Sequence, residues 1–156
     1  MNMNITLLDA ETLGNDLNFD IFSAFGQTVV YRNTLPNEVE SRIADSDIII
    51  VNKIKLNAQN LQKASRLKLI CVAATGFDNI DMAYCRLHGI GVCNVVGYST
   101  HSVAQLTLAM VLSLSVHLTE YRSFVHSGQY TKSGVANRLT PTYHELCGKV
   151  WGIVGM

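Results

Sequence analysis

The sequence predicts an α/β fold: a parallel sheet with helices on both faces, then a crossover helix and the first strand of a second sheet. Apolar runs of strand length alternate with helical patterns about five times in roughly the first 120 residues, which is typical of βα units. The run that follows Asp47 is apolar through Val51, as expected of a strand covered on both sides. A total of 156 residues is enough for about one domain with a real core.

The first three strands are expected at residues 5–8, 28–31 and 47–51. Between the first two, residues 17–25 space their apolar side chains as a helical stripe, which Gly26 would end as a C-cap. Thr34 and Pro36 predict the start of a short helix before the third strand. Another helix is expected over residues 56–67.

Two further strands, at residues 69–73 and 91–94, each end in a polar turn that contains glycine. Thr75 and Gly76 form the first turn, and a helix is expected to open at residues 78–79. Ligands of open α/β sheets bind outside the carboxyl ends of the strands. If these two strands are neighbours, residues 75–78 and 97–102 share one rim of a cleft, where we expect the function of the protein.

A long helix is predicted from about residue 100 to residue 120. Residues 103–118 are apolar on almost every side, and such a helix must be buried on every side. The run is too short, and too often interrupted by polar residues, to span a bilayer comfortably. Part of the helix is therefore expected to meet a second domain or a second subunit.

The last part of the chain is expected to be an extended arm followed by one strand. Residues 121–145 are polar and rich in Gly, Ser and Thr, which marks a domain boundary. Residues 148–156 then form an apolar run that reaches Gly155, as the first strand of a dinucleotide-binding βαβ unit does. Since the later glycines and the ribose-binding acid are absent, this motif alone is weak.

Composition narrows the class of protein. The chain is 48% apolar and 15% charged with zero formal charge, so it is globular, and neither nucleic acid nor an anionic membrane is expected as a partner. The N-terminus shows no secretory signal. The four cysteines lie far apart without a Cys-x-x-Cys pair, so we expect buried free thiols in the cytoplasm and no metal site.

Five stretches resemble the D-isomer-specific 2-hydroxyacid dehydrogenases, in particular the glycerate dehydrogenase (hydroxypyruvate reductase) branch. They are residues 49–53 (IIVNK), 68–81 (KLICVAATGFDNID), 94–100 (NVVGYST), 102–105 (SVAQ) and 148–155 (GKVWGIVG). The resemblance covers essentially the whole chain. It implies a flavodoxin-like substrate (lid) domain over residues 1–99 and a crossover helix and arm over 100–147 that form the interface of a homodimer. Residues 148–156 would begin a truncated NAD(P)-binding Rossmann domain.

The resemblance also implies roles for particular residues. Backbone N–H groups of Thr75 and Gly76 would hold the substrate carboxylate, which agrees with the ability of N–H clusters to bind anions. Asn52 and Lys53 would face the same cleft, and Tyr98 would lie beside the substrate. For each residue a structural interpretation remains open: a simple turn, an exposed lysine or a packing aromatic ring.

Two further positions would approach the cofactor, NAD or NADP. Thr100 would lie near the nicotinamide, unless it is only the N-cap of the long helix, and Gly155 would begin the nucleotide-binding turn. Asp78 and Asp81 are expected to cap the helix after the first turn, and His101 matches no catalytic position.

The family transfers a hydride between NAD(P)H and a small 2-oxo or D-2-hydroxy acid such as hydroxypyruvate, glycerate or glyoxylate. Its catalytic Arg and His–Glu pair lie later in the chain, and no His here has a carboxylate at a suitable spacing. We therefore expect no catalytic residue in residues 1–156 and no activity of this chain alone. The alternative is a non-catalytic flavodoxin-like module that pairs with a full-length paralogue. A phosphorylated receiver domain is disfavoured because Asn52 stands where such a domain carries an Asp.

Overall fold

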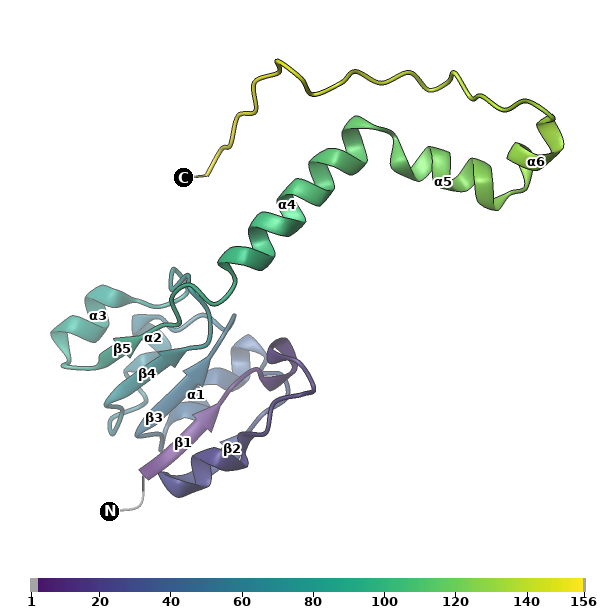
Figure 1. The fold of residues 1–156 in the computed structure, drawn as a ribbon. Helices are drawn as coiled ribbons and strands as arrows, with labels where there is room; N and C mark the ends of the chain where they lie inside the picture. Colours follow the sequence, from purple (N-terminus) through teal and green to yellow (C-terminus); the bar gives the residue numbers. More distant parts are fainter. Residues whose placement is uncertain (1–2, 156) are drawn as a thin grey trace. The chain divides into compact units, whose positions relative to one another are not determined.

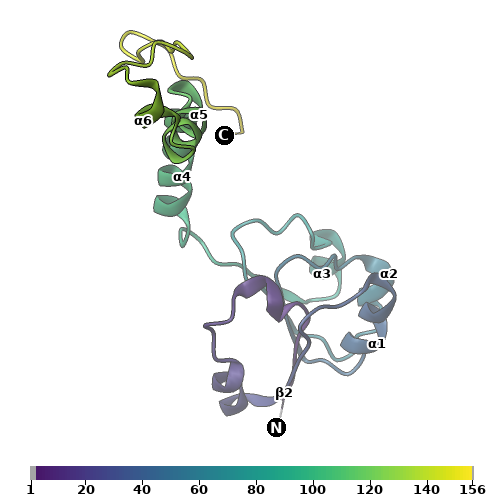
Figure 2. The same ribbon diagram turned by 90° about the vertical axis from the view of Figure 1, so that its right-hand side faces the viewer.

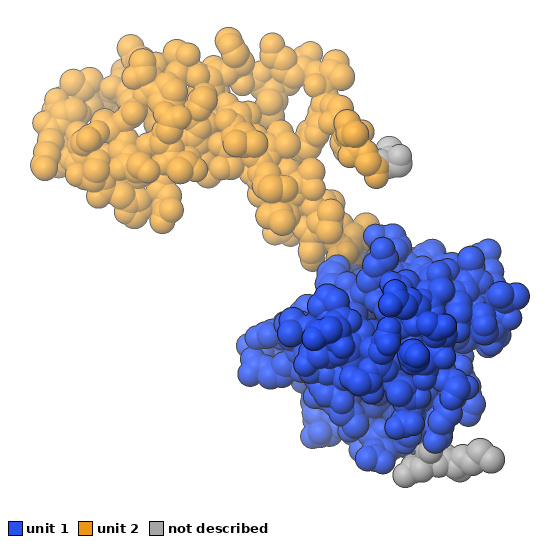
Figure 3. Space-filling view, turned by 180° about the vertical axis from the view of Figure 1, so that it is seen from behind, with its two compact units in different colours: residues 1–98 blue, residues 99–156 orange. Residues whose placement is uncertain are grey.

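The chain divides into two compact units, residues 1–98 and residues 99–156 (Figure 3). The structure is a computed structural model that describes residues 3–155.

The first unit is built on one parallel sheet (Figure 1). Its five strands are β1 (Met3–Leu7), β2 (Gly26–Val30), β3 (Ile48–Val51), β4 (Leu69–Val72) and β5 (Gly91–Cys93). They lie in the order β2-β1-β3-β4-β5, and every neighbouring pair is parallel. This is the flavodoxin-like strand order, so the predicted α/β fold with a parallel sheet is confirmed.

The two faces of the sheet are covered differently. Helices α1 (Val39–Ile43), α2 (Ala58–Leu61) and α3 (Met82–Leu87) cover one face, and the 3-10 helices η1 (Ala10–Leu13) and η2 (Phe19–Ala24) lie on the other (Figure 2). Ile49 and Val51 enter the core beneath α1–α3, whereas Ile50 enters the core beneath η1 and η2. Because alternate residues of β3 are buried on opposite faces, its apolar run is continuous.

The helical segments of this unit differ from prediction in their bounds. The stripe at residues 17–25 forms only η2, which begins after Asn18, whose side chain accepts from the Asp20 N–H at 2.8 Å. Gly26 is not a C-cap: it is buried and is the first residue of β2. The helix expected over 56–67 is limited to α2, with Leu61 and Ala64 buried as expected.

The helix after the first glycine turn begins later than predicted. Asp81, rather than Asp78, caps α3, because its carboxylate accepts from the Tyr84 N–H at 2.9 Å. Asn79 is used elsewhere: its side-chain amide donates to the Ile54 carbonyl at 2.9 Å. The side chain that was expected to open a helix therefore ties two loops together.

The cysteines are less buried than predicted. Cys85 is fully buried, Cys71 is half-buried, and Cys93 and Cys147 are exposed. The prediction of buried thiols is therefore correct only for Cys85. The sheet face that carries Cys71 and Cys93 is covered incompletely.

The second unit contains α4 (Thr100–Ser115), α5 (Leu118–His126) and α6 (Gln129–Ser133). The single helix predicted to residue 120 ends at Ser115, because His117 adopts a left-handed conformation with φ 53°. The predicted extended arm instead contains most of α5 and all of α6. Among the described residues no single helix is long and apolar enough to cross a bilayer, and only the pair α4 and α5, bent by 67°, meets the requirement in length and composition.

Within residues 3–155 the long helix is exposed, and its predicted burial was against a second domain or a second subunit. No residue of α4 is buried, and Leu106 and Leu114 are 59% and 77% exposed. Residues 148–155 form no strand, contrary to expectation, because no described strand lies beside them to share backbone hydrogen bonds.

Asp47 fixes the amino-terminal edge of the sheet. Its buried carboxylate accepts from the Asn4 N–H at 2.9 Å, from Arg66 at 3.0 Å and from Lys68 at 3.3 Å. The Asn4 N–H contributes most to holding the pKa of this carboxyl below its usual value, and the Lys68 and Arg66 cations add to this against the opposing effect of burial. One side chain thereby joins the amino-terminal ends of β1, β3 and β4.

We expect Asp47 to contribute to acid denaturation. Because its pKa is lower in the folded than in the unfolded chain, its contribution is complete above pH ~4 and is lost as the pH falls through the folded pKa. Asp47→Asn should therefore reduce stability at pH 6 and flatten the decline in free energy of unfolding below pH ~4. Urea unfolding over this pH range measures both effects. The exposed Asp45→Asn is the control, and an equal acid slope in wild type and Asp47→Asn would refute the assignment.

Candidate functional site

The carboxyl ends of β1, β3, β4 and β5 meet at one edge of the sheet, where the sequence placed the site. The loop after β3 carries Asn52 and Lys53, the loop after β4 carries Thr75 and Gly76, and Tyr98 follows β5. Because β4 and β5 are direct neighbours, the first glycine turn and the residues after β5 share one rim, as predicted.

A buried carboxylate organises the loop after β3. Asp9, which is 1% exposed, accepts from the backbone N–H groups of Asn52 at 2.9 Å and Lys53 at 2.6 Å. The Asn52 side-chain amide donates in turn to the Thr12 hydroxyl at 2.9 Å. The loops after β1 and β3 are thus joined by charge-assisted bonds, which are the stronger kind.

Sequence reasoning did not select Asp9 as a site residue. Its signal was present, since it is an acidic residue directly after an apolar strand of a parallel sheet. A carboxylate there lies beside the next strand's carboxyl end, where backbone N–H groups of the following loop need acceptors. In this structure it positions Asn52 rather than facing solvent.

The loop after β4 is held by its own side chains and by β5. The Thr75 hydroxyl donates to the Val95 carbonyl at 2.9 Å, and the Asn94 amide donates to the Thr75 carbonyl at 2.7 Å. Thr75 and Gly76 are exposed. Within residues 3–155, the N–H groups of residues 75–77 donate to no protein acceptor, so they are available to an anion.

Beside this loop the surface has a hollow of about 380 Å³. Its lining residues come from four loops or strand ends: Thr12, Leu13, Leu17, Asn52, Ala73, Val95 and Tyr98. Tyr98 is 64% exposed, so its ring is not a packing residue of this unit. Asn52 and Tyr98 are therefore brought together, as predicted.

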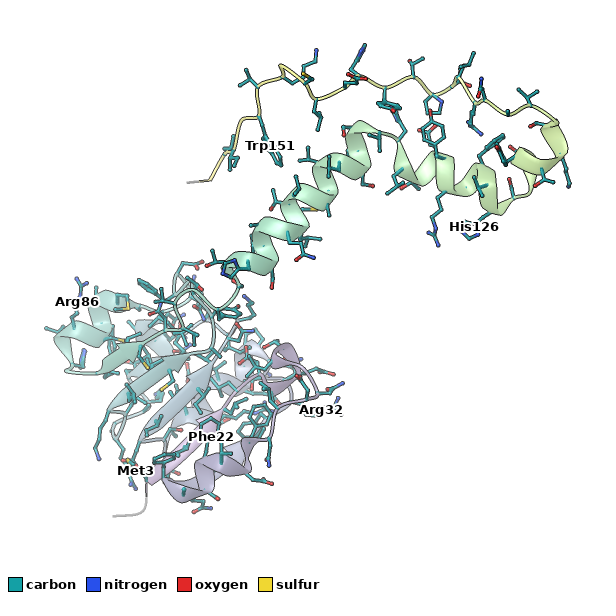
Figure 4. The ribbon with its side chains drawn as sticks, in the orientation of Figure 1. Met3, Phe22, Arg32, Arg86, His126 and Trp151 are labelled. Atoms are coloured by element: carbon teal, nitrogen blue, oxygen red, sulfur yellow. The ribbon has the colours of Figure 1, made fainter. Side chains whose placement is uncertain are left out.

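Lys53 is not part of this hollow. Its backbone is bound to Asp9, and its side chain lines a separate hollow with Pro36, Val39 and neighbouring residues. Asn52 and Lys53 lie in a bend after β3, and their side chains line different hollows. At the end of β2, Arg32 extends into solvent and pairs with Glu11 at 3.1 Å, so it supplies no free cation here (Figure 4).

The two residues expected near a cofactor belong to the second unit. Thr100 is the first residue of α4, and Ser99, not Thr100, holds the N-cap position. Gly155 has φ 112°, a conformation that favours glycine, and a Cβ added there would meet no atom within 4 Å.

One histidine does contact a carboxylate, contrary to expectation. Nδ1 of His117 lies 3.5 Å from Glu120 at the bend between α4 and α5. Glu120 lies in the first turn of α5, where a negative charge is favourable for the helix, so the pair stabilises the bend. Among residues 3–155 no group of three or more His, Cys, Asp or Glu side chains is placed to bind a metal ion.

The sequence model of the protein family described as D-isomer specific 2-hydroxyacid dehydrogenase, catalytic domain, matches residues 8–148 of this chain. The chain belongs to this family. Among its relatives, it is 31% identical to a hydroxypyruvate reductase of Blautia hydrogenotrophica over 157 residues, which is 98% of this chain and 49% of that protein. It is 37% identical to a glyoxylate reductase of Thermococcus litoralis over 102 residues, 65% of this chain and 31% of the relative.

A solved structure supports the same assignment. The D-lactate dehydrogenase of Aquifex aeolicus, complexed with NAD and lactic acid, matches with a TM-score of 0.71 and 28% identity over 92% of this chain and 41% of that chain. This chain thus spans about half the length of the hydroxypyruvate reductase and less of the other two.

Proposed function

We propose that residues 3–98 bind the substrate of an NAD(P)-dependent D-2-hydroxyacid dehydrogenase, a small 2-oxo or D-2-hydroxy acid such as hydroxypyruvate, glycerate or glyoxylate. The observation that best supports this proposal is the exposed loop at Thr75 and Gly76, whose N–H groups have no acceptor within the described residues. Such groups attract a carboxylate without side-chain charge. Relatives named hydroxypyruvate reductase and glyoxylate reductase support the substrate class.

The neighbouring residues take complementary roles in this proposal. Asn52 and Tyr98 line the hollow beside the loop and would contact the rest of the substrate. Lys53 lies outside the hollow, so it would contribute positive charge at a distance rather than a direct contact.

The cofactor would be NAD or NADP, which supplies or accepts the hydride when bound. Thr100 and Gly155 are the candidate contacts, and the open space and positive φ at Gly155 suit a backbone that approaches a phosphate. Residues 148–155 form no strand, so the described residues would supply only a small part of the nucleotide site.

We expect the chain of residues 1–156 to bind the acid without reducing it, because the family's catalytic Arg and His–Glu pair are expected outside these residues. Mixing it with hydroxypyruvate and NADH should leave the NADH absorbance unchanged. Titration with hydroxypyruvate should shift the amide resonances of Thr75, Gly76 and Phe77 in a saturable manner. Turnover of NADH would refute the expected inactivity, and unshifted amides would refute the binding site.

Two substitutions at Gly76 separate binding by the N–H group from general disruption of the loop. Gly76→Pro removes this donor and should weaken hydroxypyruvate binding by about tenfold or more, the equivalent of one charge-assisted hydrogen bond. Gly76→Ala keeps the donor, and its Cβ would meet only the Asp78 carboxylate at 3.4 Å, so binding should persist. Equal loss in both variants would argue against recognition through this N–H group.

The exposed apolar surface of α4 favours a second function, association with another chain. Its leucines and Met110 are 42–77% exposed, more than a stable monomer usually leaves on one helix. The partner in our proposal is a second copy, through residues 100–147; a non-catalytic module pairing with a full-length paralogue is the alternative.

Light scattering after size exclusion tests this association. The wild-type chain should show twice its 17.2 kDa mass, and Leu106→Glu combined with Met110→Glu should return it to the monomer mass. Gln105→Glu adds a charge to the same exposed helix at a position that is already polar, so it should leave the dimer intact. A monomer at all concentrations would exclude the homodimer and leave the paralogue as the candidate partner.

A further inference from the structure

Two thiols lie side by side on neighbouring strands of the first unit. Cys71 of β4 and Cys93 of β5 are direct partners in the parallel register. Their sulfur atoms lie 3.5 Å apart, with the Cys93 thiol donating to the Cys71 sulfur. The register of two neighbouring strands thus brings together two thiols that are 22 positions apart in the chain.

Both thiols lie on the sheet face opposite α1–α3. Ile70 and Val72 enter the core beneath those helices, and Cys71 between them packs instead against the core beneath η1 and η2. Its register partner Cys93 points to the same face, since paired residues of adjacent strands share a face. Cys93 is exposed and Cys71 is half-buried, so a small reagent reaches the Cys93 thiol directly.

We propose that Cys71 and Cys93 form a reversible dithiol–disulfide pair, which small-molecule disulfides oxidise to a cross-link between β4 and β5. Adjacent strands are separated by about 4.8 Å, within the Cα separation of about 4.4–6.8 Å that disulfides occupy. Closing the 3.5 Å gap to the length of an S–S bond therefore needs side-chain rotation and little movement of the strands.

The exposure of the two thiols sets the order of the steps. Burial, with Cys93 adding to it, raises the pKa of the Cys71 thiol to about 12, so Cys71 stays protonated and is a poor first nucleophile. The Cys93 thiolate attacks one sulfur of a small disulfide, forms a mixed disulfide and releases one small thiolate. The Cys71 sulfur, losing its proton to solvent, then attacks the Cys93 sulfur and expels the second small thiolate.

The exchange is balanced in atoms and electrons. Two electrons pass from the protein dithiol to the small disulfide, and the two thiol protons end on the two small thiols. The reverse sequence, with excess small dithiol, restores both cysteines. An exposed disulfide of this kind is easily reduced, which suits a reversible site.

The cross-link would enclose the loop at Thr75 and Gly76. These residues lie in the segment between Cys71 and Cys93, and Asn94, the residue after Cys93, holds the Thr75 carbonyl. Oxidation would therefore restrict the strands beneath that loop, a consequence for substrate binding that rests on the proposed function. Formation of the disulfide does not depend on it.

The test uses the chain of residues 1–156 with Cys147→Ser, which removes the other exposed thiol. Treatment with oxidised glutathione should give a chain that is lighter by two hydrogen atoms and is not linked to a second chain. Dithiothreitol should restore the original mass. In the same background, Cys71→Ser should stop at a stable glutathione adduct on Cys93. Cys93→Ser should remain unmodified over the same time, because Cys71 is half-buried. Intact mass and non-reducing electrophoresis measure all three outcomes.

Three results would overturn the proposal. A wild-type Cys71–Cys93 pair that stops at the glutathione adduct would show that the second step does not occur. A disulfide that joins two chains would show that Cys93 reacts with another molecule instead. Loss of two hydrogen atoms in Cys93→Ser would assign the bond to Cys71 and Cys85, which share one tryptic peptide and are otherwise difficult to distinguish.

Discussion

Replacing Gly26 with alanine is expected to lower the free energy of unfolding by about 1–3 kcal/mol or more, which is the usual effect of adding volume where nothing can yield. A Cβ at Gly26 would overlap the carbonyl oxygen of Met3 and lie 2.8 Å from its carbonyl carbon. Both atoms belong to the backbone of β1, directly opposite in the register. The collision is relieved only if β1 and β2 separate at this end.

Gly91→Ala is the matched control for this substitution. Gly91 is also the first residue of an edge strand, β5, but its added Cβ would meet the flexible Leu69 side chain at 3.3 Å and the Lys68 carbonyl at 3.4 Å. Alanine should be tolerated there within about 0.5 kcal/mol, or should stabilise slightly because glycine disfavours strands. Urea unfolding followed by circular dichroism compares the two. Equal destabilisation would contradict the argument from close approach.

The strands were predictable because their signal is local. β3 and β4 are short apolar runs, β1 and β2 contain apolar and β-branched residues, and alternate burial on two faces keeps β3 apolar throughout. The direct contact between the turn after β4 and the residues after β5 followed from the rule that parallel strands end at one edge.

Gly26 and Asp81 show what the sequence pattern could not decide. A glycine after a helical stripe usually marks a C-cap, but here the β1 backbone approaches so closely that only glycine fits. Asp78, Asn79 and Asp81 are all acceptable caps, and a tertiary contact from Asn79 to Ile54 selected the last. Both outcomes depend on residues distant in sequence.

The sequence pattern of α4 leaves its covering surface undecided for a related reason. A helix that is apolar on every side indicates that something covers it, and the pattern does not identify what. Within residues 3–155 the helix is exposed, and measurement of the mass in solution would show whether a second copy covers it.

Removing the Asp9 carboxylate is expected to have a comparable effect on stability, about 2–4 kcal/mol for Asp9→Ala. It would leave the Asn52 and Lys53 N–H groups without acceptors, and each unsatisfied buried donor costs about 1–3 kcal/mol. Lys53 is exposed, so water can replace part of the bond lost by its N–H group. The expected loss of stability is therefore smaller than the sum of two full penalties. Asp9→Asn retains one acceptor oxygen and should lose less.

Glu11→Gln controls for the loss of a negative charge. Glu11 lies two residues along the chain but is exposed, and its bond to Arg32 should contribute about 1 kcal/mol or less. Amide hydrogen exchange locates the effect: Asp9→Ala should accelerate exchange at Asn52 and Lys53 far more than at Thr75, whose loop is held separately by Asn94. If Asp9→Ala instead disturbed both loops equally, the two halves of the rim would be one cooperative unit. If exchange rose only at Asn52 and Lys53, weaker hydroxypyruvate binding in this variant would assign a direct role to the loop after β3.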